Sequence, residues 1–280
     1  MPTVTDIWYF APFNALFCVV FAAFILLLVV GSLILRKKSE RTRRRALVVA
    51  CLVTLVGFFF YKYFLSLDTD YDRITAAMGG FNWWGELPLQ LCNINMLLIP
   101  IAVTTRKKAL LSFCFFVGPI GAMMALALPG NGFSGYSLLL PRMLGYYGTH
   151  FAIIIEALAI ATLGFYRSSF CDLPLTMLTI FGICLAVFGI DMLLRTTGLH
   201  PKANYFYAVE TEGNALLELF HRWIPLPFLY LLPSLVILAV YVSLVMLCFT
   251  LVPRLFDRRA PRGWIPQRRS ASCAKSAASP

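Results

Sequence analysis

The sequence predicts an all-α membrane protein, built as a bundle of seven transmembrane helices with the N-terminus outside and the C-terminus in the cytoplasm. Of the 280 residues, 60% are hydrophobic and only 13% are charged, and the mean hydropathy of +0.78 excludes a soluble globular domain. Seven apolar stretches are long enough to cross a bilayer, which takes about 20 helical residues. Basic residues gather in alternate links between these stretches.

The seven expected helices cover approximately residues 12–35, 46–66, 86–104, 109–128, 143–165, 174–195 and 227–251. They form one expected transmembrane domain over residues 1–252. Residues 253–280 should be a basic, disordered cytoplasmic tail, because this stretch is rich in small and polar residues. Asp6, and not a basic region, precedes the first apolar stretch, so we expect no removable signal peptide.

The distribution of charge predicts the orientation. The link after the first helix, RKKSERTRRR, holds seven cations, and further cations follow the third, fifth and seventh helices. These regions contain 18 of the 24 basic residues, so the positive-inside rule places them in the cytoplasm. The net charge of +11 is therefore a topology signal. We expect the basic loop and tail to contact anionic lipid headgroups, and we expect no nucleic-acid partner.

The outer links have three expected features. Trp83 and Trp84 should lie in the aromatic belt at the outer interface. Residues 129–141, which are rich in Gly and Pro, should form an ordered turn or a short re-entrant loop. Residues 213–225 should form an amphipathic helix over the outer mouth of the bundle. Asp191 and Arg195, four residues apart near the outer end of the sixth helix, predict a salt bridge.

The third apolar stretch, residues 81–100, differs from the others because it contains several polar residues. They are Glu86, Gln90, Cys92, Asn93 and Asn95. Polar groups at membrane depth usually face the interior of the bundle and are functional candidates. We therefore expect an outer-facing polar cavity between the third, fifth and sixth helices.

Cys92 and His150 are predicted to lie at the same depth. The third and fifth helices both run inward, which places Cys92 about 10 Å and His150 about 12 Å below their outer ends. If the two helices are neighbours, the residues form a Cys/His pair in which the thiolate attacks an ester and leaves a thioester. The further candidates for oxyanion or substrate binding are Gln90, Asn93, Asn95, Glu86, Tyr146 and Glu156. On an ideal helix, however, Cys92 would point about 100° away from Asn93.

No metal site and no cofactor are expected, because the eight cysteines are scattered without a C-x-x-C spacing. Two non-enzymatic alternatives remain open. The protein could be a transporter or binding protein for a small polar solute or a proton, using the same polar groups. It could also be a structural subunit of a membrane complex, in which Asn and Gln hydrogen-bond neighbouring helices.

The segments ELPLQLCNINMLLIP and YYGTHF, on seven helices, resemble the YwaF family of integral membrane proteins, whose motif is close to LPLHLC. An animal relative of that family, transmembrane protein 164, is described as a cysteine-dependent acyltransferase that moves polyunsaturated chains onto ether lysophospholipids. The resemblance implies a multi-pass protein of the cell membrane that acts on a phospholipid or lysophospholipid, with Cys92 as nucleophile and His150 as its partner. Gln90 stands where the family pattern has histidine, so it becomes an oxyanion or headgroup donor.

Overall fold

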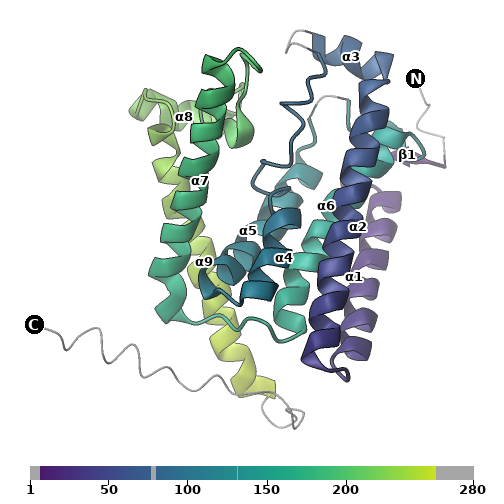
Figure 1. Cartoon of the computed structure of the whole chain (residues 1–280), viewed down its shortest axis with the longest axis vertical. Helices are drawn as coiled ribbons and strands as arrows, with labels where there is room; N and C mark the ends of the chain where they lie inside the picture. Colours follow the sequence, from purple (N-terminus) through teal and green to yellow (C-terminus); the bar gives the residue numbers. More distant parts are fainter. Residues whose placement is uncertain (1–6, 77–79, 131, 257–280) are drawn as a thin grey trace, which may run out of the picture.

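The computed structural model describes residues 7–76, 80–130 and 132–256, and Figure 1 shows their path. The helices are α1 (Ala15–Leu35), α2 (Glu40–Ser66), α3 (Thr69–Thr75), α4 (Asn95–Thr105), α5 (Lys108–Ala127), α6 (Pro141–Thr162), α7 (Leu173–Thr196), α8 (Ala215–Trp223) and α9 (Leu232–Phe256). Single 3₁₀ turns, η2 (Phe170–Asp172), η3 (Tyr205–Tyr207) and η4 (Leu229–Leu231), lie between the later helices. The strands β1 (Tyr9–Phe10) and β2 (Tyr136–Ser137) form a short antiparallel ribbon.

In the part of the chain that the structure describes, six helices are long and apolar enough to cross a membrane: α1, α2, α5, α6, α7 and α9. The protein is therefore a mostly helical, multi-pass membrane protein. The expected count of seven such helices is not confirmed. The third expected helix forms only over α4, whose 11 residues span about 16 Å, roughly half of the hydrocarbon core.

The first half of the third segment, residues 82–94, folds as a series of turns. Pro88 has no backbone N–H to donate and disfavours a helical conformation at Leu87, and regular helix begins only at Asn95. The backbone instead closes tight turns, such as those from Gly85 N–H to Asn82 O (2.8 Å) and from Ile94 N–H to Gln90 O (2.9 Å). Figure 1 shows this segment running from α3 into the bundle, where α4 continues it.

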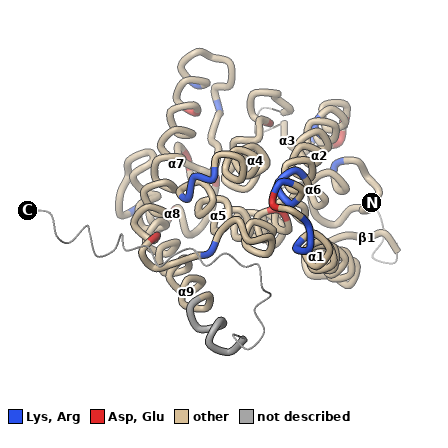
Figure 2. Tube along the Cα trace, turned by 60° about the horizontal axis from the view of Figure 1, so that its bottom comes forward, with Lys and Arg blue, Asp and Glu red and all other residues tan. Residues whose placement is uncertain are grey.

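The two ends of the bundle differ in charge. The links α1–α2, α4–α5 and α6–α7 lie at one end, and Figure 2 shows that the basic residues gather there. The β ribbon, α3 and α8 lie at the other end (Figure 1). β1 and the end of α9 therefore lie at opposite ends of the bundle.

Helix α6 is the centre of the bundle and packs against α1, α2, α4 and α5, while α7 packs against α5 and α9. The closest approach is at Gly145 of α6, where an added Cβ would lie 2.2 Å from the Cβ of Tyr61 on α2. Because that atom belongs to the rigid start of a side chain, only glycine fits here. This contact holds α2 beside the part of α6 that carries His150.

Several smaller predictions can be compared with the structure. In the expected loop of residues 129–141, residues 132–140 form turns and the strand β2, which pairs with β1, while residue 131 lies outside the described residues. The expected amphipathic helix is α8, capped by Asn214, with Leu217 and Phe220 buried. Trp83 and Trp84 are exposed in the turns that follow α3, and their place in an aromatic belt stays a prediction.

Two other predictions have different outcomes. The expected salt bridge between Asp191 and Arg195 is replaced, since Arg195 pairs with Glu210 (2.8 Å) and Asp191 accepts a hydrogen bond from the backbone N–H of Tyr205 (2.9 Å). The expected domain boundary at residue 252 falls inside α9. The tail beyond it, residues 257–280, lies outside the described residues, so its expected disorder is not tested.

Candidate functional site

The turns of residues 82–94 are held on one side by the loop of residues 199–208. The side-chain oxygen of Gln90 accepts from the backbone N–H of Phe206 at 2.8 Å, and the hydroxyl of Tyr205 donates to the carbonyl oxygen of Trp84. Non-helical backbone is stable at membrane depth only where protein groups satisfy its hydrogen bonds. His200 of the same loop lies against Gly85, and burial lowers the pKa of its imidazole. Gln90 therefore fastens the segment to the loop.

On the other side of these turns, Cys92 meets His150 of α6. The Cys92 Sγ and the His150 Nε2 are 3.6 Å apart, and both residues are buried, with 8% and 4% of their surface exposed. The sequence placed these residues at one depth, and the structure brings them into contact. This is the geometry in which an imidazole can exchange a proton with a thiol.

The hydrogen bond of the other ring nitrogen fixes the tautomer of His150. Nδ1 lies 2.7 Å from the carbonyl oxygen of Tyr146, which can only accept, so Nδ1 carries the proton and donates it. Nε2 is then unprotonated and presents its lone pair to Sγ. The Tyr146 ring packs on the imidazole at 4.4 Å, and its hydroxyl donates to the carbonyl oxygen of Ala125 at 2.7 Å. The imidazole is thus held in place before any substrate binds.

Two features near the Cys92 sulfur act on it in opposite directions. The residue lies three positions before α4, whose N-terminal end carries the positive side of the helix dipole and favours a thiolate. The Cys92 thiol donates to the Asn93 Oδ1 at 3.6 Å, a contact that favours the protonated form. The N–H of the residue after a nucleophile is also a common oxyanion donor. This backbone group is a site component that the sequence analysis missed, because it depends on a turn that the helical interpretation did not contain.

Asn95 shapes the turn around Cys92. It is completely buried, and its amide nitrogen donates to the carbonyl oxygens of Leu91 (2.8 Å) and Cys92 (3.1 Å). Both amide hydrogens are used in this way. Gly118 of α5 allows the close approach, since an added Cβ would lie 3.3 Å from the Asn95 Oδ1 and 2.8 Å from the Cβ of Ala157. Asn95 therefore has no amide hydrogen left for a substrate.

Glu86 forms an ion pair with Lys62 of α2, a residue that the sequence analysis did not select. Lys62 is only 7% exposed, and its ammonium lies 4.7 Å from the ring centroid of Tyr61. The sequence did contain an indication of this ion pair, because Lys62 is the only charged residue inside the second apolar stretch and Glu86 is the only acid in the third. Pairing these two would have placed both segments side by side.

Glu156 is separated from the pair of Cys92 and His150. It lies six residues, about 9 Å, further along α6 than His150. One carboxylate oxygen accepts from the hydroxyl of Thr54 at 2.6 Å. The other oxygen is buried without a partner among the described residues. The structure therefore brings together Cys92, His150, Tyr146 and Asn93, and leaves Glu156 in a separate polar cluster with α2.

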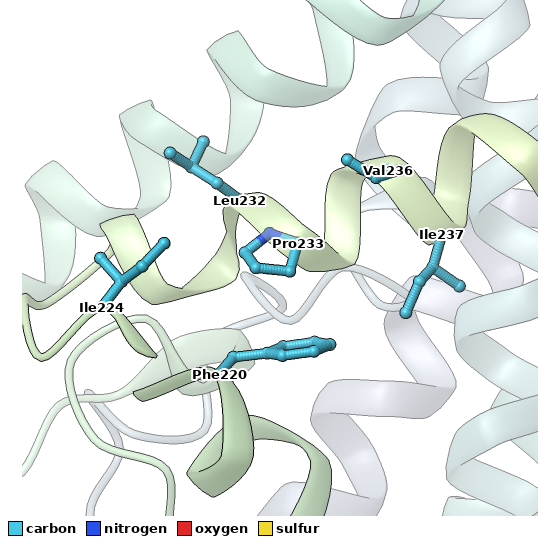
Figure 3. Close-up of a pocket in the computed structure, with 6 residues that line it drawn as sticks. All are labelled: Phe220, Ile224, Leu232, Pro233, Val236 and Ile237. Carbon is cyan, nitrogen blue, oxygen red and sulfur yellow. The ribbon is translucent and has the colours of Figure 1, made fainter. Parts of the chain in front are cut away.

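The described residues also form two apolar grooves on α9. One has a volume of about 410 Å³ and is lined by Phe220, Ile224, Leu232, Pro233, Val236 and Ile237 from α8, α9 and the link between them (Figure 3). The second, about 440 Å³, continues along α9 past Val240 and Leu244. Neither groove reaches the cavity position that the sequence predicted. No group of His, Cys, Asp and Glu side chains within the described ranges could hold a metal ion.

Comparison with known proteins gives one match. The model of the TMEM164 family matches residues 9–249, which includes the six apolar helices, the turns of residues 82–94 and the loop of residues 199–208. No curated protein and no solved structure matches the chain. The match supports the relation to transmembrane protein 164, while the assignment to the YwaF family stays a prediction. Because the match covers most of the sequence, this chain belongs to the TMEM164 family of membrane proteins.

Proposed function

We propose that this protein transfers an acyl chain between membrane lipids through a thioester on Cys92, with a phospholipid or lysophospholipid as substrate. The observation that supports this most directly is the 3.6 Å contact between the Cys92 Sγ and the unprotonated His150 Nε2. The family match and the resemblance to a cysteine-dependent acyltransferase point to the same chemistry.

In the first half-reaction, Nε2 of His150 takes the Cys92 proton, and the thiolate attacks the carbonyl carbon of a lipid ester. The carbonyl oxygen becomes an oxyanion, to which the backbone N–H of Asn93 can donate. When the C–O bond breaks, the imidazolium returns the proton to the departing alkoxide. The products are a lysolipid and the acyl thioester of Cys92.

In the second half-reaction, the free hydroxyl of a lysolipid replaces the one that left. His150 takes its proton, the oxygen attacks the thioester carbonyl, and the thiolate departs and regains the proton from the imidazolium. The surroundings suit an acyl chain, because Cys92 belongs to a cluster of buried apolar side chains that includes Phe58, Met96 and Phe151. Since both reacting residues are buried, the lipid must enter by displacing part of this packing.

For the orientation, we propose that the basic end of the bundle faces the cytoplasm and that β1, α3 and α8 face outside. The support is the concentration of cations at one end (Figure 2), which follows the positive-inside rule. The turns of residues 82–94 together with α4 then act as a third crossing in a seven-crossing bundle. The basic loop would contact anionic headgroups of the cell membrane.

The test is intact-protein mass spectrometry of the purified full-length chain after reconstitution with phosphatidylcholine. We expect a mass increase of one acyl chain that hydroxylamine removes, because thioesters react with this reagent. Cys92→Ala should abolish the adduct. Cys184→Ala, which removes another buried free cysteine on α7, should retain it. A folded protein without any adduct, and without lipid turnover in a longer assay, would refute the proposal.

One observation favours a second function, the binding or transport of a small polar solute or a proton. Glu156 keeps a buried carboxylate oxygen without a partner among the described residues, and intramembrane carboxylates commonly serve as ion or proton sites. This function predicts that Glu156→Gln abolishes uptake into vesicles while Cys92→Ser does not. The acyltransferase function predicts the reverse sensitivity. Loss of stability in both variants, without any activity in the parent protein, would instead favour a structural subunit.

A further inference from the structure

Arg142 is a buried cation in the first turn of α6. It is the only Lys or Arg of that helix, and only 3% of its surface is exposed. Its Nη1 donates to the Asp68 carboxylate at 2.6 Å, and its guanidinium lies 4.5 Å from the ring centroid of Tyr136. The Nε–H is buried without a partner among the described residues. Since buried N–H groups are nearly always hydrogen-bonded, this one is a candidate to bind a ligand oxygen.

The chemistry of this guanidinium suits a phosphate. Arginine binds phosphate oxygens through pairs of parallel N–H groups, and Asp68 accepts from Nη1 alone. The ring of Tyr136 stabilises the positive charge without accepting a hydrogen bond from Nε. Arg142 also lies at the start of α6, where no side chain caps the first backbone N–H groups and the helix dipole favours an anion.

Arg142 shares one stripe of α6 with two residues of the candidate site. Tyr146 and His150 follow it at intervals of four residues, and side chains at this spacing lie above one another on one helix face. The eight residues from Arg142 to His150 cover about 12 Å along the axis, and both side chains lean toward the start of the helix, which preserves this separation.

This separation matches the substrate of the proposed function. In a glycerophospholipid, a few bonds separate the phosphate from the ester carbonyl carbon. An extended molecule can therefore span about two helical turns when a hydrogen bond to Arg142 is added at one end and a thiol contact at the other. With its phosphate on Arg142, the lipid brings the ester carbon to the level of the Cys92 Sγ, which lies 3.6 Å from the His150 Nε2.

We propose that Arg142 binds the phosphate of the lipid substrate and that Asp68 competes with this phosphate for the guanidinium. This inference deepens the proposed function and rests on it for the place of the ester at Cys92. The side chain of Asp68 is 24% exposed, so the phosphate can approach from its side. The site then prefers a phospholipid or lysophospholipid to a neutral glyceride with the same chain.

A purely structural ion pair predicts a different behaviour. Asp68 also accepts from the backbone N–H of Tyr71 at 3.0 Å, so the pair connects α3 with α6. If this connection were its whole role, loss of either member would weaken the binding of all lipids alike. If Arg142 binds the phosphate, its loss weakens the binding of phosphate-containing lipids alone, and loss of the Asp68 charge strengthens that binding.

The experiment compares two ligands in the full-length chain with Cys92→Ser, which prevents turnover. Native mass spectrometry from detergent micelles measures the binding of lysophosphatidylcholine and of a monoacylglycerol with the same chain. We expect lysophosphatidylcholine to bind about tenfold more tightly, because hydrogen bonds between charged groups are strong where water is excluded. Inorganic phosphate at equal concentration should not displace it, since phosphate alone lacks the contacts of the chain.

Four variants test the role of each group. Arg142→Gln should reduce the preference to about one, while the monoacylglycerol binds as before. Arg142→Lys keeps the charge but not the paired N–H groups, and should lower the preference about threefold. Asp68→Asn can still cap Tyr71 and should raise the affinity for lysophosphatidylcholine about threefold. Asp172→Asn, which removes the partner of Lys108 at the opposite end of the bundle, is the matched control and should change neither affinity.

Three results would overturn the inference. They are a preference that Arg142→Gln leaves unchanged, equal losses of both ligands in Asp68→Asn, and displacement of the lipid by inorganic phosphate, which would assign the site to free phosphate. If Arg142→Gln does not fold, Arg142→Lys and Asp68→Asn decide the question.

Binding requires no chemistry, so the two proposals can fail separately. A preference that depends on Arg142, in a protein that forms no acyl adduct on Cys92, would refute the acyltransferase function and keep the phosphate site. An adduct on Cys92 without this preference would support the acyltransferase function and refute the role of Arg142.

Discussion

The helices around α6 and the helices α7 to α9 place their buried polar groups differently. Around α6, His150, Asn95 and Lys62 are buried and adjoin the non-helical turns of residues 82–94. In the other group, Asp172 and Asp191 lie near the two ends of α7, where they contact Lys108 and the loop of residues 199–208. The first arrangement builds a reactive environment, and the second fastens loops. The chemistry should therefore depend on the first group alone, which the first of the four comparisons below tests, while the other three test what holds each group together.

The largest difference in the rate of adduct formation is expected between variants of two histidines. His150→Ala should lower the rate of adduct formation on Cys92 by at least about 100-fold, because the general base is lost. His221→Ala should change it little, since this residue lies on α8 beside Tyr230. The measurement is the initial rate of the hydroxylamine-labile mass increase. Equal losses in both variants would show that the two parts of the molecule are not separate in function.

A difference of comparable size, in stability, is expected between two glycines. Gly145→Ala places a Cβ against Tyr61 and should destabilise the fold by about 3 kcal/mol, because α2 and α6 must separate. Gly189→Ala on α7 meets nothing within 4 Å and should be neutral or stabilising. Unfolding in mixed detergent micelles measures both. Gly148→Ala, three residues along α6, is the control within the same helix. Its added methyl group also changes the helix propensity of α6 but meets nothing within 4 Å, so it lacks the contact with Tyr61.

Substitutions of Asp191 test the fastening of the loop. Asp191→Ala removes the acceptor for the backbone N–H of Tyr205 and should cost about 1 to 2 kcal/mol. Asp191→Asn keeps an acceptor and should cost less. Limited proteolysis between residues 199 and 212 reports the loosening directly. If Asp191→Asn is cleaved as quickly as Asp191→Ala, the charge and not the hydrogen bond holds this loop.

The smallest effect is expected on the exposed face of α9. Val240 is 57% exposed and lines a groove, so Val240→Ala should change the unfolding free energy by less than about 0.5 kcal/mol. Val242, two residues along, is fully buried, and Val242→Ala should cost about 1 kcal/mol through lost packing. A greater cost at Val240 would mean that protein, and not lipid, covers this groove.

The sequence was sufficient to predict that Cys92 and His150 lie at the same depth, but it left open whether their two segments are neighbours. Both lie a similar number of residues from the outer end of inward-running segments, and depth depends mainly on that number. It was not sufficient for the local geometry. The helical pattern separated the side chains of Cys92 and Asn93 by about 100°, whereas in the turns the Cys92 Sγ lies 3.6 Å from the Asn93 Oδ1. Hydrophobicity reports burial in the membrane, but it does not distinguish a helix from turns whose hydrogen bonds are satisfied elsewhere.

Two charged contacts show the same limit. The spacing of Asp191 and Arg195 favoured a local pair, but each side chain binds the loop of residues 199–210 instead. Lys62 and Glu86, in contrast, form an ion pair between two different segments, 24 residues apart in the chain. The spacing of residues in the sequence cannot predict such tertiary contacts, because the free energy that each contact contributes depends on groups that only the fold brings together.

The turns of residues 82–94 have a consequence for biogenesis. Their backbone and Gln90 rely on partners at residues 199–206, which the ribosome adds more than a hundred residues later. Until α7 and the following loop emerge, this stretch cannot satisfy its hydrogen bonds in lipid. This stretch should therefore wait inside the translocon, or at the water interface, and enter the bundle late. Truncation of the nascent chain before residue 199 would leave it accessible to water-soluble thiol reagents at Cys92.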